Sequence, residues 1–167
     1  TSWLEDQLLS SPKTMRKFIK LLYVPYNEFD FKTEEEYEAF LRDNPFRALS
    51  NDLVKSGQEL AIANWFHLNG VSFHYENRYV TKRRLDPGVD YKPDFDLGNG
   101  LYLEHFGIDR HGNTRVGVDP QKYQAGIEWK RELHEEHGTT LLETYSYEGF
   151  EEIRLSILYK MLNKLKK

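Results

Sequence analysis

The chain of 167 residues contains no cysteine. This absence excludes disulfide bridges, thiolate zinc sites and cysteine nucleophiles, and it suits a reducing compartment, so we expect a cytoplasmic protein. Long apolar runs are missing too. No run approaches the roughly 20 residues that a helix needs to span a bilayer, and no signal peptide opens the sequence. We therefore expect no membrane partner.

Positive charge is in the minority, with a formal net charge of −4. The chain as a whole therefore has no bulk attraction for nucleic acid, and any DNA contact must use a local basic patch. The best candidate is the run Lys82, Arg83 and Arg84, which lies in a loop between two predicted strands. From there it can contact phosphates or remain solvated. No phosphate-binding P-loop motif is present, which excludes ATP hydrolysis by that route.

The hydrophobic pattern that is present predicts one domain of alternating helices and strands. Capping residues, prolines and glycines mark the boundaries. Helices are expected at 12–22, 33–43, 51–70, 119–138 and 149–167, and strands at 71–80, 91–97, 101–109 and 139–147. The order predicts an α/β fold in which residues 50–148 form the core. Residues 1–49 form an N-terminal helical extension, and 149–167 a C-terminal amphipathic helix.

The segment YKPDFDLGNGLYLEHFGID at 91–109 predicts a hairpin that sets two acids side by side. A three-residue loop at 98–100 pairs Phe95 with Leu103 and Asp94 with Glu104. Opposed side chains lie about 4.5 to 5.5 Å apart, where like charges destabilise a sheet. A divalent cation such as Mg²⁺ or protonation of one acid would relieve the repulsion. Alternatively, the acids lie on a solvated face.

Glu59 supplies a third carboxylate. It shares a helical stripe with Ile62, Ala63 and Phe66, so it should face the sheet, where a buried acid needs a partner. It also lies three residues after Ser56, which is the spacing of a capping box at a helix start. The residues alone leave the metal site and the cap open.

These residues, Glu59, Pro93-Asp94 and Glu104, together with the order of elements over residues 50–147, resemble the PD-(D/E)XK nuclease superfamily. The segments SGQELAIANWFHLNGVSFHYE, YKPDFDL, YLEHFGID and EWKRELHEEHGTTLLETYSY are similar to nuclease-like domains carried within superfamily 1 DNA helicases of the UvrD/Rep type. A start at Thr1 fits a module taken from a longer chain. The resemblance implies helicase motor domains on the same polypeptide as partners.

The resemblance also implies a restriction-endonuclease-like core, made of a helix, a three-stranded antiparallel meander, a helix and a strand. It implies hydrolysis of DNA phosphodiesters with Mg²⁺ or Mn²⁺, leaving a 5′-phosphate and a 3′-hydroxyl. Asp94 and Glu104 would be metal ligands, Glu59 an additional acid, and the backbone carbonyl of His105 a further oxygen.

The sequence departs from the family at the lysine. Glu104-His105-Phe106 stands where the pattern has Glu-X-Lys. Lys92, on the acid face of its predicted strand, and Lys130, on the following helix, are the two replacements. We favour Lys130, because it shares a stripe that should pack on the sheet with Tyr123, Gly126, Ile127 and His134. The alternative is an inactive DNA-binding or interaction module with the same fold.

Overall fold

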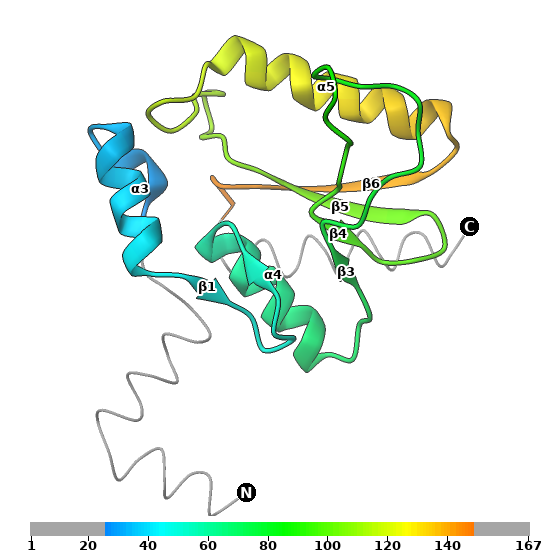
Figure 1. Cartoon of the computed structure of the whole chain (residues 1–167), viewed down its shortest axis with the longest axis horizontal. Helices are drawn as coiled ribbons and strands as arrows, with labels where there is room; N and C mark the ends of the chain where they lie inside the picture. Colours follow the sequence, from blue (N-terminus) through cyan, green and yellow to red (C-terminus); the bar gives the residue numbers. More distant parts are fainter. Residues whose placement is uncertain (1–25, 149–167) are drawn as a thin grey trace, which may run out of the picture.

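A four-stranded sheet with one helix on each face forms the centre of the computed structural model (Figure 1), which describes residues 26–148. Helix α4 (Gly57–Leu68) lies on one side of the sheet and α5 (Pro120–Glu136) on the other. The predicted α/β class is confirmed. The predicted helices at 12–22 and 149–167 lie outside the described residues.

The strands follow the order β3 (His74–Tyr75), β4 (Phe95–Asp96), β5 (Leu101–Phe106) and β6 (Thr140–Tyr145) across the sheet. The first three are antiparallel neighbours, whereas β5 and β6 are parallel. A parallel pair needs a long crossover, and α5 provides it. From α4 onward, helix, three antiparallel strands, helix and parallel strand therefore follow one another as predicted.

Local signals explain where the helices begin. The hydroxyl oxygen of Ser56 accepts from the backbone N–H of Glu59 at the start of α4, and the Asp119 carboxylate accepts from that of Lys122 at the start of α5. Thr33 caps α3 (Glu34–Asp43) in the same way. These caps satisfy amide groups that have no partner inside the helix.

The β4–β5 hairpin has the predicted register. Phe95 pairs with Leu103, and the backbone N–H of Leu97 donates to the carbonyl of Leu101 over 2.9 Å. Asn99, with a φ of 53°, lies between two glycines that also have positive φ, which is the backbone that this tight loop requires. Asp94 directly precedes Phe95 and Glu104 directly follows Leu103, so the two acids lie beside each other.

Both faces of the sheet are covered, and this coverage removes the acids from bulk water. On the α4 side the core contains Leu60, Ile62, Phe66, Phe95, Leu103 and Leu142. On the α5 side it contains Tyr79, Tyr91 and Leu133, with Tyr102 and Trp129 packed against them. Asp94 and Glu104 therefore do not lie on a solvated face of the sheet.

Several local predictions are wrong. The helix expected over 51–70 begins only at Gly57, because Leu53–Val54 pair as a strand with Phe46–Arg47. The strand expected over 71–80 shrinks to His74–Tyr75, because Glu76 has a φ of 48°, which no extended strand can continue through. A short hairpin of β1 (Phe46–Arg47) and β2 (Leu53–Val54), and a 3-10 turn η1 (Glu28–Asp30), were not predicted. Two-residue strands give too little alternation to detect in a sequence.

Candidate functional site

Glu104 lies on β5 beneath α5, and only 1% of it is exposed. Tyr91 donates its phenolic hydrogen to Oε1 over 2.8 Å, and Lys130 Nζ lies 2.6 Å from Oε2. Asp94, immediately before β4, accepts the backbone N–H of His105 at Oδ2 over 2.7 Å. The structure therefore brings Asp94, Glu104 and Lys130 together in one cluster, in which Glu104 is buried and the other two residues are half-buried.

Ionisation of the Asp94 carboxyl is unfavourable in this cluster. Burial raises its pKa well above the usual value, and the negative charges of Glu104 and Glu59 raise it further. The ammonium of Lys130 and the N–H of His105 lower the pKa without reversing the shift. A bound cation would lower the energy of the ionised form, since opposite charge favours the charged state of an acid.

Lys130 reaches the acids from the middle of α5 and keeps its proton. Burial lowers its pKa, but the charges of Glu104 and Asp94 outweigh burial, so the pKa lies above its usual value. The ammonium also lies 5.3 Å from the Phe106 ring centre. Lys92 is exposed and forms no ion pair with any residue in the 26–148 range. Of the two predicted lysines, only Lys130 is at the acids.

Glu59 performs the capping function that the sequence offered as an alternative. It is 7% exposed, and its carboxylate accepts from the Ser56 hydroxyl over 3.1 Å, the Tyr75 hydroxyl over 2.5 Å and the backbone N–H of Lys55 over 3.2 Å. Burial raises its pKa, and these three donors lower it only in part. Glu59 is close enough to raise the pKa of Asp94. It thus acts both as a cap and as a neighbouring negative charge.

Within residues 26–148, no three Asp, Glu or His side chains stand close enough together to hold a metal ion. Mg²⁺, however, commonly takes only one or two carboxylates and completes its shell with waters and substrate phosphate oxygens. The pair Asp94 and Glu104 has the right donor chemistry for that arrangement. Burial raises the pKa of Asp94, and the charges of Glu104 and Glu59 raise it further. Mg²⁺ or Mn²⁺ would be held by these two carboxylates.

Two buried histidines support the site from either face. His105 lies between Thr144, whose Oγ1 is 2.9 Å from Nδ1, and Gln58, whose Oε1 is 2.8 Å from Nε2. His134 Nε2 lies 3.1 Å from the hydroxyl of Tyr91, the tyrosine that also contacts Glu104. Burial lowers the pKa of each histidine to about 4, so both are neutral near pH 7.

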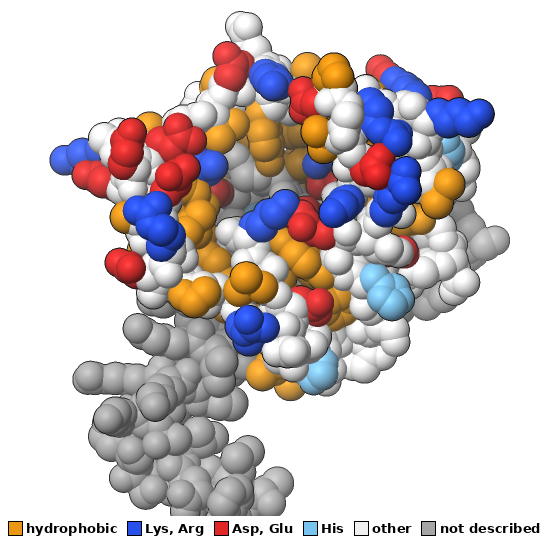
Figure 2. Space-filling view, in the orientation of Figure 1, with side chains coloured by type: hydrophobic (Ala, Val, Ile, Leu, Met, Phe, Trp, Pro, Cys, Tyr) orange, Lys and Arg blue, Asp and Glu red, His pale blue; other side chains and the backbone are white. Residues whose placement is uncertain are grey.

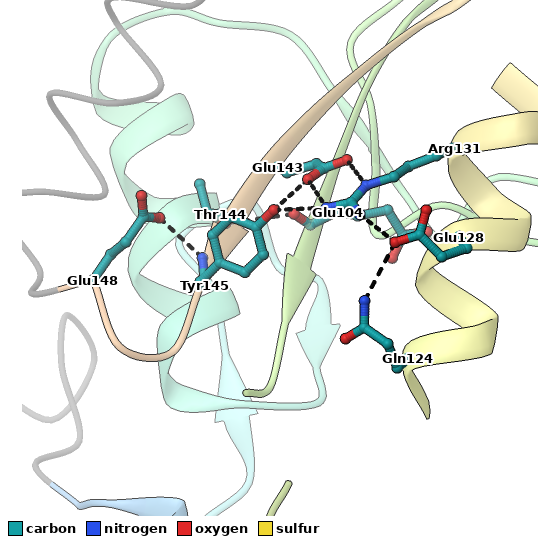
Figure 3. A network of polar contacts seen from close by, with 8 residues as sticks. All are labelled: Glu104, Gln124, Glu128, Arg131, Glu143, Thr144, Tyr145 and Glu148. Atoms are coloured by element: carbon teal, nitrogen blue, oxygen red, sulfur yellow. Dashed lines mark hydrogen bonds and ion pairs between the residues drawn. The ribbon is translucent and has the colours of Figure 1, made fainter. Parts of the chain in front are cut away.

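Arg131 attaches α5 to β6 immediately beside Lys130 (Figure 3). Its guanidinium donates to both oxygens of Glu143 over 2.8 and 2.7 Å, and to Glu128 over 2.6 Å. Glu143 pairs with Glu104 across the parallel β5–β6 ladder. The bidentate contact therefore fixes the helix that carries Lys130 against the strand next to Glu104. Sequence reasoning missed Arg131, Tyr91 and Gln58.

The predicted basic run is largely neutralised. Arg83 pairs with Glu136 at 2.7 Å, and Arg84 pairs with Asp90 at 2.6 Å. Lys82 is exposed and has no ion pair within the described part of the chain. The run therefore presents little free positive charge to a phosphate backbone.

Comparison with known proteins finds no matching family model, no matching curated protein and no matching solved structure. Among residues 26–148, no helix combines the length and the apolar character needed to cross a membrane. Any function therefore has to be argued from the geometry of the site.

Proposed function

We propose that this chain is a metal-dependent DNA nuclease module of the PD-(D/E)XK type, with a restriction-endonuclease-like core, which works beside helicase motor domains on the same polypeptide in the cytoplasm. The observation that carries the proposal is the contact of Lys130 with Glu104 beside Asp94 in a cluster shielded by α5. Two acids can hold a metal ion that activates a water for hydrolysis of a phosphodiester, and a lysine can stabilise the negative charge that develops.

Each residue has a role in this chemistry. When bound, Mg²⁺ or Mn²⁺ supplies a Lewis acid for the phosphate and lowers the pKa of a water molecule. Asp94 and Glu104 hold the ion at the sheet. Lys130 keeps its ammonium near that position, where it orients the attacking water and stabilises negative charge that develops on the phosphate. Tyr91 and Arg131 position Glu104 and α5.

The charge balance supports a site that takes up a cation. A structural acid in a protein interior is normally neutralised by its partners, because an unpaired buried charge is costly. Here two carboxylates face one ammonium, and the Asp94 pKa is raised rather than lowered. A purely structural pair would need only Glu104 and Lys130.

The second candidate is a DNA-binding or interaction module without cleavage. The ion pair of Lys130 with Glu104 favours it, because that contact already occupies one carboxylate oxygen at 2.6 Å, and Tyr91 occupies the other at 2.8 Å. In this case Asp94 would be retained only for its hydrogen bond with the His105 backbone.

A cleavage assay separates the two candidates. Labelled DNA is incubated with Mn²⁺ and wild type, Asp94→Asn or Asp96→Asn. Asp96 is a matched control, because it is the next acid along the chain, and its carboxylate accepts from the Asn77 amide and the backbone N–H of Gly98, each at 2.9 Å, instead of facing Glu104. The nuclease proposal expects cleavage by wild type and Asp96→Asn and none by Asp94→Asn. Absence of cleavage by wild type contradicts it and leaves the binding module.

A further inference from the structure

Two pockets adjoin the acid cluster. The first, of about 510 Å³, is lined by Glu59, His105 and the residues of α3 and the β1–β2 hairpin, and Figure 2 shows a hollow between the α3 and α5 sides of the surface. The second, of about 360 Å³, is lined by Lys130. Both share Val118 and Tyr123, so they meet at these side chains.

Residues that line the two pockets contact the acids. His105, which lines the first pocket, donates its backbone N–H to Asp94 over 2.7 Å, and Lys130, which lines the second, lies 2.6 Å from Glu104. Tyr123 lines both pockets. A phosphate bound at the acids would therefore lie next to both pockets.

We propose that the two pockets take the bases of the unpaired nucleotides on either side of the scissile phosphate, so that the substrate is single-stranded DNA. This inference rests on the proposed nuclease function. Pockets of roughly 300 to 1,000 Å³ receive small molecules, a range that includes a single nucleotide. A base stacked in a duplex cannot enter such a pocket unless it leaves the stack.

The first pocket offers a surface on which a base can stack. The guanidinium carbon of Arg115 lies 4.3 Å from the centre of the Tyr37 ring, and both residues line the pocket. Tyr37 covers one face of this planar group. Arg115 is only half-buried, and its other face can stack on a base, a contact that proteins use for unpaired strands.

Polar groups at the same pocket suit a base edge. Glu28 lines it, and burial raises the pKa of this carboxyl even though Ser146 and Arg115 lower it. Gln58 adds an amide whose oxygen accepts from the Ser146 hydroxyl over 2.8 Å. Carboxyl and amide groups of this kind pair with the donors and acceptors on exposed bases.

The surface charge also disfavours a duplex. Proteins that bind duplex DNA neutralise many phosphates with lysine and arginine. In the described chain, however, Arg83 and Arg84 are already paired with acids. Lys122 and Lys130 line the second pocket beside the apolar side chains of Phe106 and Ile127. These lysines are also paired with acids, so the pocket suits one nucleotide rather than a charged groove for a duplex.

Binding without cleavage tests the inference directly. Fluorescence anisotropy in EDTA compares a labelled oligothymidylate with a blunt hairpin duplex for the wild-type chain, Arg115→Ala and Arg115→Lys. Arg110→Ala is the matched control, because Arg110 lies in the same loop and 5.4 Å from the Tyr147 ring but lines neither pocket. Thermal unfolding identifies any variant that fails to fold.

We expect wild type to bind the single strand at least about tenfold more tightly than the hairpin, Arg115→Ala to lose about tenfold in single-strand affinity, and Arg110→Ala to lose less than about twofold. Arg115→Lys keeps the charge but not the plane, so it should lose nearly as much as Arg115→Ala. Equal affinity for both DNAs, or equal losses for Arg115→Ala and Arg110→Ala, overturns the inference.

Cleavage in Mn²⁺ separates this inference from the nuclease proposal. Cleavage of the duplex as fast as the single strand would refute the pocket assignment and leave the nuclease standing. Binding of the single strand that depends on Arg115, without any cleavage, would refute the nuclease and leave the pockets as a binding site for an unpaired strand.

Discussion

Replacing Lys130 with methionine tests the ion pair at the centre of the site. The substitution leaves the Glu104 carboxylate, 1% exposed, with Tyr91 as its remaining hydrogen-bond donor. At 2.6 Å and an effective dielectric constant of 20, the lost attraction is about 6 kcal/mol, part of which the desolvation of the two ions offsets. Removing one partner of a buried pair costs about 3 to 5 kcal/mol. The Lys130 side chain is 25% exposed, so we expect a loss near 3 kcal/mol.

Urea denaturation followed by circular dichroism measures this loss, with Lys122→Met as the matched control. Lys122 lies on the same helix, but it is exposed and 3.7 Å from Asp86, so its removal should cost less than about 0.5 kcal/mol. Adding Glu104→Gln to Lys130→Met should recover most of the stability, because the double variant no longer has an unpaired charge at position 104. Equal losses for Lys130→Met and Lys122→Met would refute a buried ion pair.

Three further predictions concern stability. Between pH 6.5 and 4, the free energy of unfolding should fall as pH falls, by up to about 1.4 kcal/mol per pH unit for each of His105 and His134. In this range the unfolded state binds protons at the two histidines, whereas the folded state, in which their pKa is about 4, does not. An unfolding free energy that stays constant with pH in urea titrations would contradict the neutral, buried state of these histidines. Asp94→Asn should raise the metal-free unfolding free energy by about 1 kcal/mol, since it removes a carboxylate repelled by its neighbours; a lower denaturation midpoint would count against this. Arg131→Ala should lower the free energy of unfolding by about 1 kcal/mol, because it removes the bidentate contact of a 37% exposed side chain with Glu143. An unchanged urea midpoint would show that this contact does not hold α5 against the sheet.

The sequence predicted those helices and strands whose signals come from neighbouring residues. The capping residues Thr33 and Asp119 predicted the starts of two helices. The helix expected from residue 51 begins only at Gly57, where Ser56 caps it. Period-two alternation around the glycine-rich loop predicted that Phe95 pairs with Leu103. Because these signals involve neighbouring residues only, they could be read without knowledge of the tertiary contacts.

The rest depends on contacts between distant segments. Alternation along an ideal strand placed Lys92 on the acid face, but β4 begins only at Phe95, and Tyr91 is the side chain that reaches Glu104. Arg115 and Tyr37 come from segments 78 positions apart, and no local pattern connects them. The choice between Lys92 and Lys130 likewise needed the position of α5 over the sheet.

The most direct test of the account is whether Asp94 and Glu104 hold a divalent cation. Electron paramagnetic resonance can measure Mn²⁺ binding to wild type, Asp94→Asn, Glu104→Gln and the control Asp96→Asn. We expect wild type and Asp96→Asn to bind Mn²⁺ with similar affinity, and Asp94→Asn and Glu104→Gln to bind it at least about tenfold more weakly. Equal Mn²⁺ affinity in all four proteins, or no binding by wild type, would contradict a metal site at these two carboxylates.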